Sequence, residues 1–133
     1  MILVDTSIWI DYFNGIDSQE AALLDLALDD GIVAMGDLIF LEILQGFRDD
    51  KEFRKAKKAL ATLDQYELFG DQMVDRCADN YRFLRKRGIT IRKTIDLIIA
   101  TFCIENKFPL LFSDKDYIPF VELLKLEKYQ ANT

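Results

Sequence analysis

The chemically most suggestive residues near the start of the chain are Asp5, Thr6 and Ser7, a carboxylate followed by two hydroxyls. They end the apolar run 2–4, which is typical of a buried strand. In open α/β sheets, ligands bind beyond the carboxyl ends of the strands. The triplet therefore suits a hard cation, although the same residues also suit the capping of a turn or of a helix start.

Glu42 is the only charged residue within the apolar stretch 38–44. The composition of 37–47 predicts a helix that is buried on most of its faces. Burial of an unpaired ionised carboxylate is costly or raises its pKa. Glu42 therefore needs a partner, a proton or a metal, unless it lies on one solvent-facing edge of the helix.

Three further carboxylates have ordinary structural explanations when each is taken alone. Asp96 lies in the first turn of an apolar helix that begins at Thr94, where the helix dipole favours an acid. Asp114 and Asp116 follow the apolar run 110–112 in a loop, where aspartate is common. The pair is a poor calcium loop, because the glycine and the later glutamate of such loops are missing.

Taken together, the positions of these acids indicate a binding site. Asp5 and Asp114 both follow apolar strands, whose carboxyl ends share one edge of a parallel sheet, and Asp96 opens the helix before the second strand. Like charges this close repel one another, and a divalent cation resolves the repulsion. Oxygen ligands suit Mg²⁺, with Mn²⁺ as a reasonable substitute. A water activated by the metal is then the most accessible nucleophile for phosphodiester hydrolysis.

The composition narrows the possible functions. The 133 residues carry a net charge of −6, which argues against nucleic-acid binding over the whole surface. The chain has no histidine, so the commonest general base and transition-metal ligand are absent. We expect a single domain over 1–133 that is cytoplasmic, since the sequence shows neither a membrane-spanning apolar stretch nor a signal-peptide pattern.

Apolar patterning predicts strands that alternate with helices. Such alternation indicates βαβ units, and hence an α/β fold with a mainly parallel central sheet and helices on both faces. The expected helices are 18–30, 37–47, 51–63, 71–86 and 94–104. The expected strands are 2–4, 32–35, 66–69, 110–112 and 123–126, with one helical turn over 117–122.

A cluster of basic residues is the clearest local positive feature of this acidic chain. It lies around the end of the predicted helix 71–86 and the loop that follows, and it consists of Arg82, Arg85, Lys86, Arg87, Arg92 and Lys93. One interpretation is a solvated helix end. The other is a surface that follows the phosphates of a nucleic acid and guides it toward the carboxylates.

Four segments together resemble the PIN-domain ribonucleases, and among them the VapC-type toxins of toxin-antitoxin pairs. They are Val4-Asp5-Thr6-Ser7-Ile8-Trp9-Ile10, Leu41-Glu42-Ile43-Leu44-Gln45-Gly46, Ile95-Asp96-Leu97-Ile98-Ile99-Ala100 and Leu110-Leu111-Phe112-Ser113-Asp114-Lys115-Asp116-Tyr117. No single segment is specific, but the set has the family's order and approximate spacing and covers essentially the whole chain. The resemblance implies a PIN-like three-layer α/β/α domain with about five strands in its sheet.

The resemblance also implies an acidic pocket that binds one or two Mg²⁺ or Mn²⁺ ions. Asp5, Glu42 and Asp96 match the family's three main acids, and Asp114 matches the fourth, with Asp116 beside it as a further candidate ligand. Thr6 or Ser7 matches a hydroxyl position that orders the site.

Two departures from the family pattern concern the surroundings of the acids. Phe112 and Ser113 stand where the family usually has threonine followed by a variable residue, so the threonine hydroxyl is either missing there or replaced from another position. Asp37 stands where many relatives have serine or threonine, and it either adds charge near the pocket or caps its helix.

The implied activity is endoribonucleolytic cleavage of RNA, with homodimerisation and inhibition by a VapB-type antitoxin whose tail enters the pocket groove. Trp9, Phe13 and Phe47 are candidate groove or interface aromatics, with core burial as the alternative. Two other functions stay open from the residues. One is a non-catalytic PIN-like binding module, and the other is an aspartate-based phosphatase with Asp5 as nucleophile, which Ser7 disfavours because such enzymes usually have a second aspartate at that position.

Overall fold

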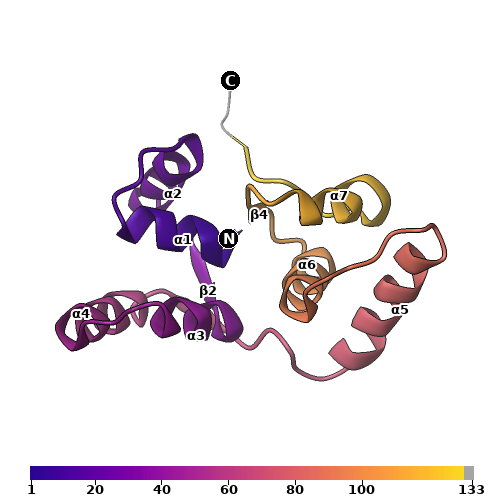
Figure 1. The fold of residues 1–133 in the computed structure, drawn as a ribbon, viewed down its shortest axis with the longest axis horizontal. Coiled ribbons are helices and arrows are strands. Elements are labelled where there is room, and N and C mark those ends of the chain that lie inside the picture. The colour runs from indigo at the N-terminus through magenta and orange to yellow at the C-terminus, as the bar shows by residue number, and fades with distance from the viewer. Residues whose placement is uncertain (131–133) are drawn as a thin grey trace.

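The structure is a computed structural model that describes residues 1–130. Within this range the chain forms short strands separated by helices (Figure 1). In chain order the elements are β1 (Leu3–Val4), α1 (Thr6–Phe13), α2 (Gln19–Asp29), β2 (Ala34–Gly36), α3 (Asp37–Gln45), α4 (Asp50–Leu60), β3 (Asp64–Tyr66), α5 (Met73–Arg85), α6 (Thr94–Asn106), β4 (Leu110–Leu111), the 3-10 turn η1 (Lys115–Tyr117) and α7 (Ile118–Leu124).

The strands form a parallel arrangement, as expected. β1 pairs with β4, and β2 pairs with β3, both in parallel. A parallel bridge between Ile2 and Val33 joins the two pairs, and a second between Leu110 and Lys128 adds an extended segment beyond β4. The spatial order is therefore 127–129, β4, β1, β2, β3, which places β1 at the centre.

Helices cover both sides of these strands. Figure 1 shows α1 to α4 on the left, with β2 between α1 and α3, and α5 to α7 on the right, with β4 near the middle. One hydrophobic cluster fills the space between the layers, and its largest fully buried side chains include Trp9, Tyr117, Phe112 and Phe120. The predicted α/β/α layering is thus confirmed. None of the helices within residues 1–130 is long and apolar enough to cross a membrane.

The sequence predictions fail at four places. The helix α1 was not expected, and it directly follows Asp5. The expected strand 66–69 is shifted toward the N-terminus, since β3 spans Asp64–Tyr66: backbone pairing with β2 includes Asp64 and Gln65 although their side chains are polar. The expected strand 123–126 is wrong, since 123 and 124 end α7 and the backbone of 127–129 pairs with β4 instead. The helix α3 is less buried than predicted, with Leu41 53% exposed.

Gly36 lies at the end of β2, where the chain passes close to a buried side chain. A Cβ atom at this position would lie 2.5 to 2.7 Å from three side-chain carbons of Leu68, which is fully buried. We therefore expect Gly36→Ala to lower the free energy of unfolding by about 1–3 kcal/mol, the usual cost of overpacking a core. Urea denaturation measures this cost. Gly70→Ala is the control, since its Cβ would meet only ordinary contacts, and equal stability of the two variants would contradict the packing around Gly36.

Candidate active site

Asp5 stands at the carboxyl end of β1, where the strand passes into α1. Its backbone N–H donates to the carbonyl of Leu111, which continues the β1–β4 pairing by one residue. Asp5 occupies the N-cap position of α1, yet its side chain makes no capping hydrogen bond. The residue is nevertheless only 7% exposed. The capping explanation of Asp5 therefore fails, and its carboxylate is directed into a site.

Both carboxylate oxygens of Asp5 accept a hydrogen bond from a hydroxyl. Ser7 Oγ donates to Oδ2 at 2.9 Å, and the Tyr117 hydroxyl donates to Oδ1 at 2.7 Å. The Tyr117 oxygen also lies 3.2 Å from Asp96 Oδ1. Asp5 and Asp96, which are far apart in sequence, thus meet at one buried phenol.

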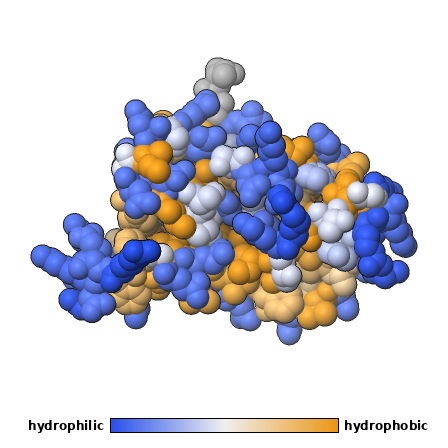
Figure 2. Space-filling model, viewed as in Figure 1, coloured by the Kyte–Doolittle hydropathy of each residue, from blue (hydrophilic) through white to orange (hydrophobic). Residues whose placement is uncertain are grey.

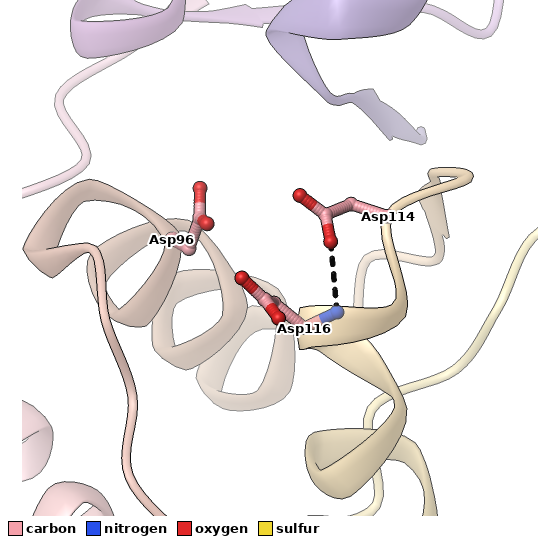
Figure 3. Close-up of side chains that lie close together, drawn as sticks. All are labelled: Asp96, Asp114 and Asp116. Carbon is pink, nitrogen blue, oxygen red and sulfur yellow. Dashed lines mark hydrogen bonds between the residues drawn. The ribbon is translucent and has the colours of Figure 1, made fainter.

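Asp96, Asp114 and Asp116 face one another from α6 and from the turn that follows β4 (Figure 3). Each offers one carboxylate oxygen, and these atoms all lie within 4.8 Å of one another. Asp114 also caps η1 by accepting from the Asp116 backbone N–H at 2.9 Å. Such a set of oxygen donors fits a hard divalent cation, which takes carboxylate ligands and keeps several waters.

Glu42 enters the same region from α3. Thr6 Oγ1 donates to Glu42 Oε1 at 2.6 Å, a hydrogen bond that ties the start of α1 to α3. A cavity of about 430 Å³ is lined by Asp5, Thr6, Ser7, Ile10, Glu42, Lys93, Thr94, Ile95, Asp96 and Asp114. The four acids expected from the sequence, together with both hydroxyl residues, therefore line one cavity, and Asp116 adjoins it.

Burial and the nearby negative charges raise the pKa values of two side chains in the site, Asp96 and Tyr117. Burial raises the pKa of Asp96 to about 6, and the nearby charges of Asp5 and Asp114 add to the rise, while the hydrogen bond with Tyr117 and the charge of Lys93 oppose it. Burial, followed by the charges of Asp5 and Asp96, also raises the pKa of Tyr117. The phenol therefore keeps its proton, and the cavity favours added positive charge.

The basic cluster divides into two parts. Arg92 Nη2 donates to both carboxylate oxygens of Asp116, at 3.1 and 3.3 Å, and Lys93 lines the acidic cavity. The other members are exposed near the end of α5, where Figure 2 shows strongly hydrophilic colour. Among them is Arg87, whose guanidinium carbon lies 3.4 Å from the centre of the Phe83 ring and whose Nη1 donates to the Phe83 carbonyl. The cluster therefore extends from the edge of the cavity to the end of α5.

Three other residues noted in the sequence have structural roles. Asp37 Oδ1 accepts from the backbone N–H groups of Leu38 and Leu68, so it ties the start of α3 to the segment after β3 and does not line the cavity. Phe112 is buried, with its ring centre 5.1 Å from that of Tyr117, and Trp9 is buried in the core. Phe13 differs from these three residues, because it is 37% exposed and so stays available as an interface aromatic.

A family model provides the comparison that decides the classification. The model described as "PIN domain" matches residues 2–122. The chain belongs to the PIN domain family. The match includes the strand end at Asp5, the α3 and α6 acids and the turn after β4, so the classification agrees with the expectation from the four sequence segments.

Relatives and solved structures extend this comparison. This chain is 29% identical over 131 residues to VapC ribonuclease Mb1587 of Mycobacterium bovis and to Ribonuclease VapC11 of Mycobacterium tuberculosis. Each alignment covers 96% of this chain and 96% of the relative. Its fold matches VapBC2 from Rickettsia felis bound to a promoter DNA fragment, with a TM-score of 0.76 and 18% identity over 99% of this chain and 100% of that one. A toxin-antitoxin complex from Klebsiella pneumoniae matches with a TM-score of 0.68 and 21% identity, over 88% and 90% of the two chains.

Sequence reasoning missed one residue of the site, Tyr117. In the sequence it is an aromatic residue beside an acidic turn, and nothing in its spacing separates it from a core residue. Only the packing of η1 against α6 and its contact with the residue that follows β1 bring the Tyr117 hydroxyl to Asp96 and Asp5.

Proposed function

We propose that this PIN domain, spanning residues 1–133, is a Mg²⁺-dependent endoribonuclease that acts as a VapC-type toxin in the cytoplasm. The observation that supports it most strongly is the convergence of Asp5, Glu42, Asp96 and Asp114 on one cavity at the carboxyl ends of β1 and β4. The similarity to proteins named VapC ribonucleases supports RNA as the substrate.

Each residue has a defined task in this proposal. Asp5, Asp96, Asp114 and Glu42 would hold Mg²⁺ or Mn²⁺, with Asp116 as a further candidate ligand. When bound, the cation lowers the pKa of a water molecule and stabilises charge on the phosphate oxygens. Thr6 fixes Glu42, and Ser7 fixes Asp5, so that both acids keep their orientation when substrate enters.

The basic cluster supplies the RNA-binding surface in this proposal. We expect the double variant Arg85→Glu, Arg87→Glu to reduce the salt dependence of RNA binding, by about 0.7 in the log–log slope for each phosphate that is no longer neutralised. Fluorescence anisotropy of a labelled RNA, measured over a range of salt concentrations, gives the slope. The control is Lys57→Glu, Lys58→Glu on α4, and an unchanged slope in the arginine variant removes the cluster from the mechanism.

The partners are also part of the proposal. We propose a homodimer that is inhibited by a VapB-type antitoxin, since the structural neighbours are toxin-antitoxin complexes. A small hollow of about 60 Å³, lined by Ile10, Phe13, Asn14, Ile43, Gly46 and Phe47, adjoins the acidic cavity through Ile10. Apolar side chains beside an acidic pocket suit an antitoxin segment that carries both apolar and basic residues.

Incubation of the purified protein with total RNA and Mg²⁺, followed by mapping of new RNA ends, tests the activity. A ribonuclease produces new internal ends, whereas a binding module leaves the RNA intact. A phosphatase also leaves the RNA intact and releases phosphate from p-nitrophenyl phosphate. New ends at reproducible positions are the expected result.

A further inference from the structure

We infer that Tyr117 is a positioning residue whose hydroxyl orients the carboxylates of Asp5 and Asp96 in the acidic cavity where a divalent cation would bind. This inference rests on the proposed function, and it adds a residue that does not itself bind the metal. The residue is fully buried, and its hydroxyl contacts both Asp5 Oδ1 and Asp96 Oδ1.

The position of the hydroxyl is fixed by the backbone and by packing. The Tyr117 N–H donates to the carbonyl of Asp114 at 3.3 Å, within the same turn that carries the Asp114 carboxylate. The ring packs against the buried ring of Phe112. Because a tyrosine side chain has only two rotatable angles, a ring held in this way places its hydroxyl with little freedom. The turn after β4 therefore provides Asp114 and also positions the hydroxyl that contacts the other two acids.

After the hydroxyl contacts are made, the carboxylate oxygens still have lone pairs that could bind a cation. A carboxylate oxygen has two lone pairs, so Asp5 keeps acceptor capacity on both oxygens after it accepts from Tyr117 and Ser7. The phenol carries one hydrogen, which lies between two acceptors. This hydrogen offsets part of the repulsion between Asp5 and Asp96. Because the phenol is neutral, it adds no positive charge that would repel a cation.

Packing alone does not explain a tyrosine at this position. A phenylalanine would fill nearly the same volume and would bury no hydroxyl, which requires partners when it is removed from water. Here the partners are the carboxylates of Asp5 and Asp96, which line the acidic cavity. Residues that orient metal ligands through hydrogen bonds typically contribute a factor of about 10 to 100 to metal affinity.

Tyr117→Phe tests the inference, with Mn²⁺ as the probe and no RNA present. We expect the dissociation constant for Mn²⁺, measured by electron paramagnetic resonance of the free ion, to rise by about 10- to 100-fold. Tyr12→Phe is the matched control, because it removes a hydroxyl-carboxylate bond of 3.0 Å, to Asp25, on an exposed face. This control is expected to bind Mn²⁺ within about twofold of the wild type, since no ligand orientation changes.

Each outcome decides between the possibilities. A folded Tyr117→Phe protein with unchanged Mn²⁺ affinity overturns the inference, and so does an equal loss in Tyr12→Phe. If Tyr117→Phe does not fold, Tyr117→Met replaces it, since it also lacks the hydroxyl and its flexible side chain adapts to a core gap. Unchanged affinity in folded Tyr117→Met then overturns the inference. A wild-type protein that binds no Mn²⁺ instead overturns the proposed function, which distinguishes the two failures.

Discussion

Asp5→Asn is expected to reduce Mg²⁺-dependent RNA cleavage on the order of 100-fold or more, while the protein stays folded. The substitution removes one charged oxygen ligand from the site. This loss lowers metal affinity and activity more than the loss of a residue that only orients a ligand does. Folding survives because the asparagine Oδ1 still accepts from Tyr117 and its Nδ2 donates toward the Ser7 oxygen. Cleavage rates of a defined RNA, with circular dichroism as the check on folding, measure the effect.

The matched control is Asp25→Asn, which removes an acid of the same type from an exposed hydrogen bond to Tyr12. It is expected to cleave RNA at close to the wild-type rate. Cleavage that persists in folded Asp5→Asn would falsify the assignment of Asp5 to the cation.

Asp96→Asn is expected to stabilise the metal-free protein, and the gain is expected to depend on pH. Burial, followed by the charge of Asp5, raises the pKa of Asp96 from 3.8 to about 6 in the folded state. The folded state therefore binds the proton more tightly than the unfolded chain does, and this stabilisation is complete below about pH 4 and is lost as the pH rises through 6. Asparagine has no such loss, and because Asp96 is only half-buried and solvent screens its charge, the variant gains about 1–2 kcal/mol at pH 7.

Urea denaturation in EDTA, carried out at several pH values, measures this gain. The stabilities of Asp96→Asn and the wild type should be similar near pH 4, separate as the pH rises from 4 to about 6, and differ by a constant amount above that. Added Mg²⁺ should then reverse the order at pH 7, since a ligand that binds only the folded state stabilises it. A constant difference at all pH values would show that packing, and not the charge of Asp96, limits stability.

The candidate site was largely predictable because its acids follow simple local patterns. Asp5 and Asp114 end apolar strands, and parallel pairing of β1 with β4 brings such ends together. Glu42 interrupts an apolar helix, which already indicates a partner, and the structure provides Thr6. These inferences needed only strand direction and the cost of burying charge.

Other features depend on contacts that no local pattern encodes. Tyr117 meets Asp5 across 112 positions of sequence, so its role depends on tertiary packing. The strand β3 contains Asp64 and Gln65, and it forms because backbone groups pair with β2 although the side chains are polar. Arg92 was predicted to bind RNA, and the structure shows it paired with Asp116, which restricts the part of the guanidinium that is free to bind a phosphate.

In the proposed mechanism, clustered carboxylates hold a divalent cation that the protein needs to cleave RNA. The most direct measurement is the cleavage rate of one defined RNA by wild-type protein after treatment with excess EDTA, and again after Mg²⁺ is added beyond the chelator. We predict no cleavage in EDTA and full recovery with Mg²⁺. Cleavage that continues unchanged in EDTA would contradict the claim.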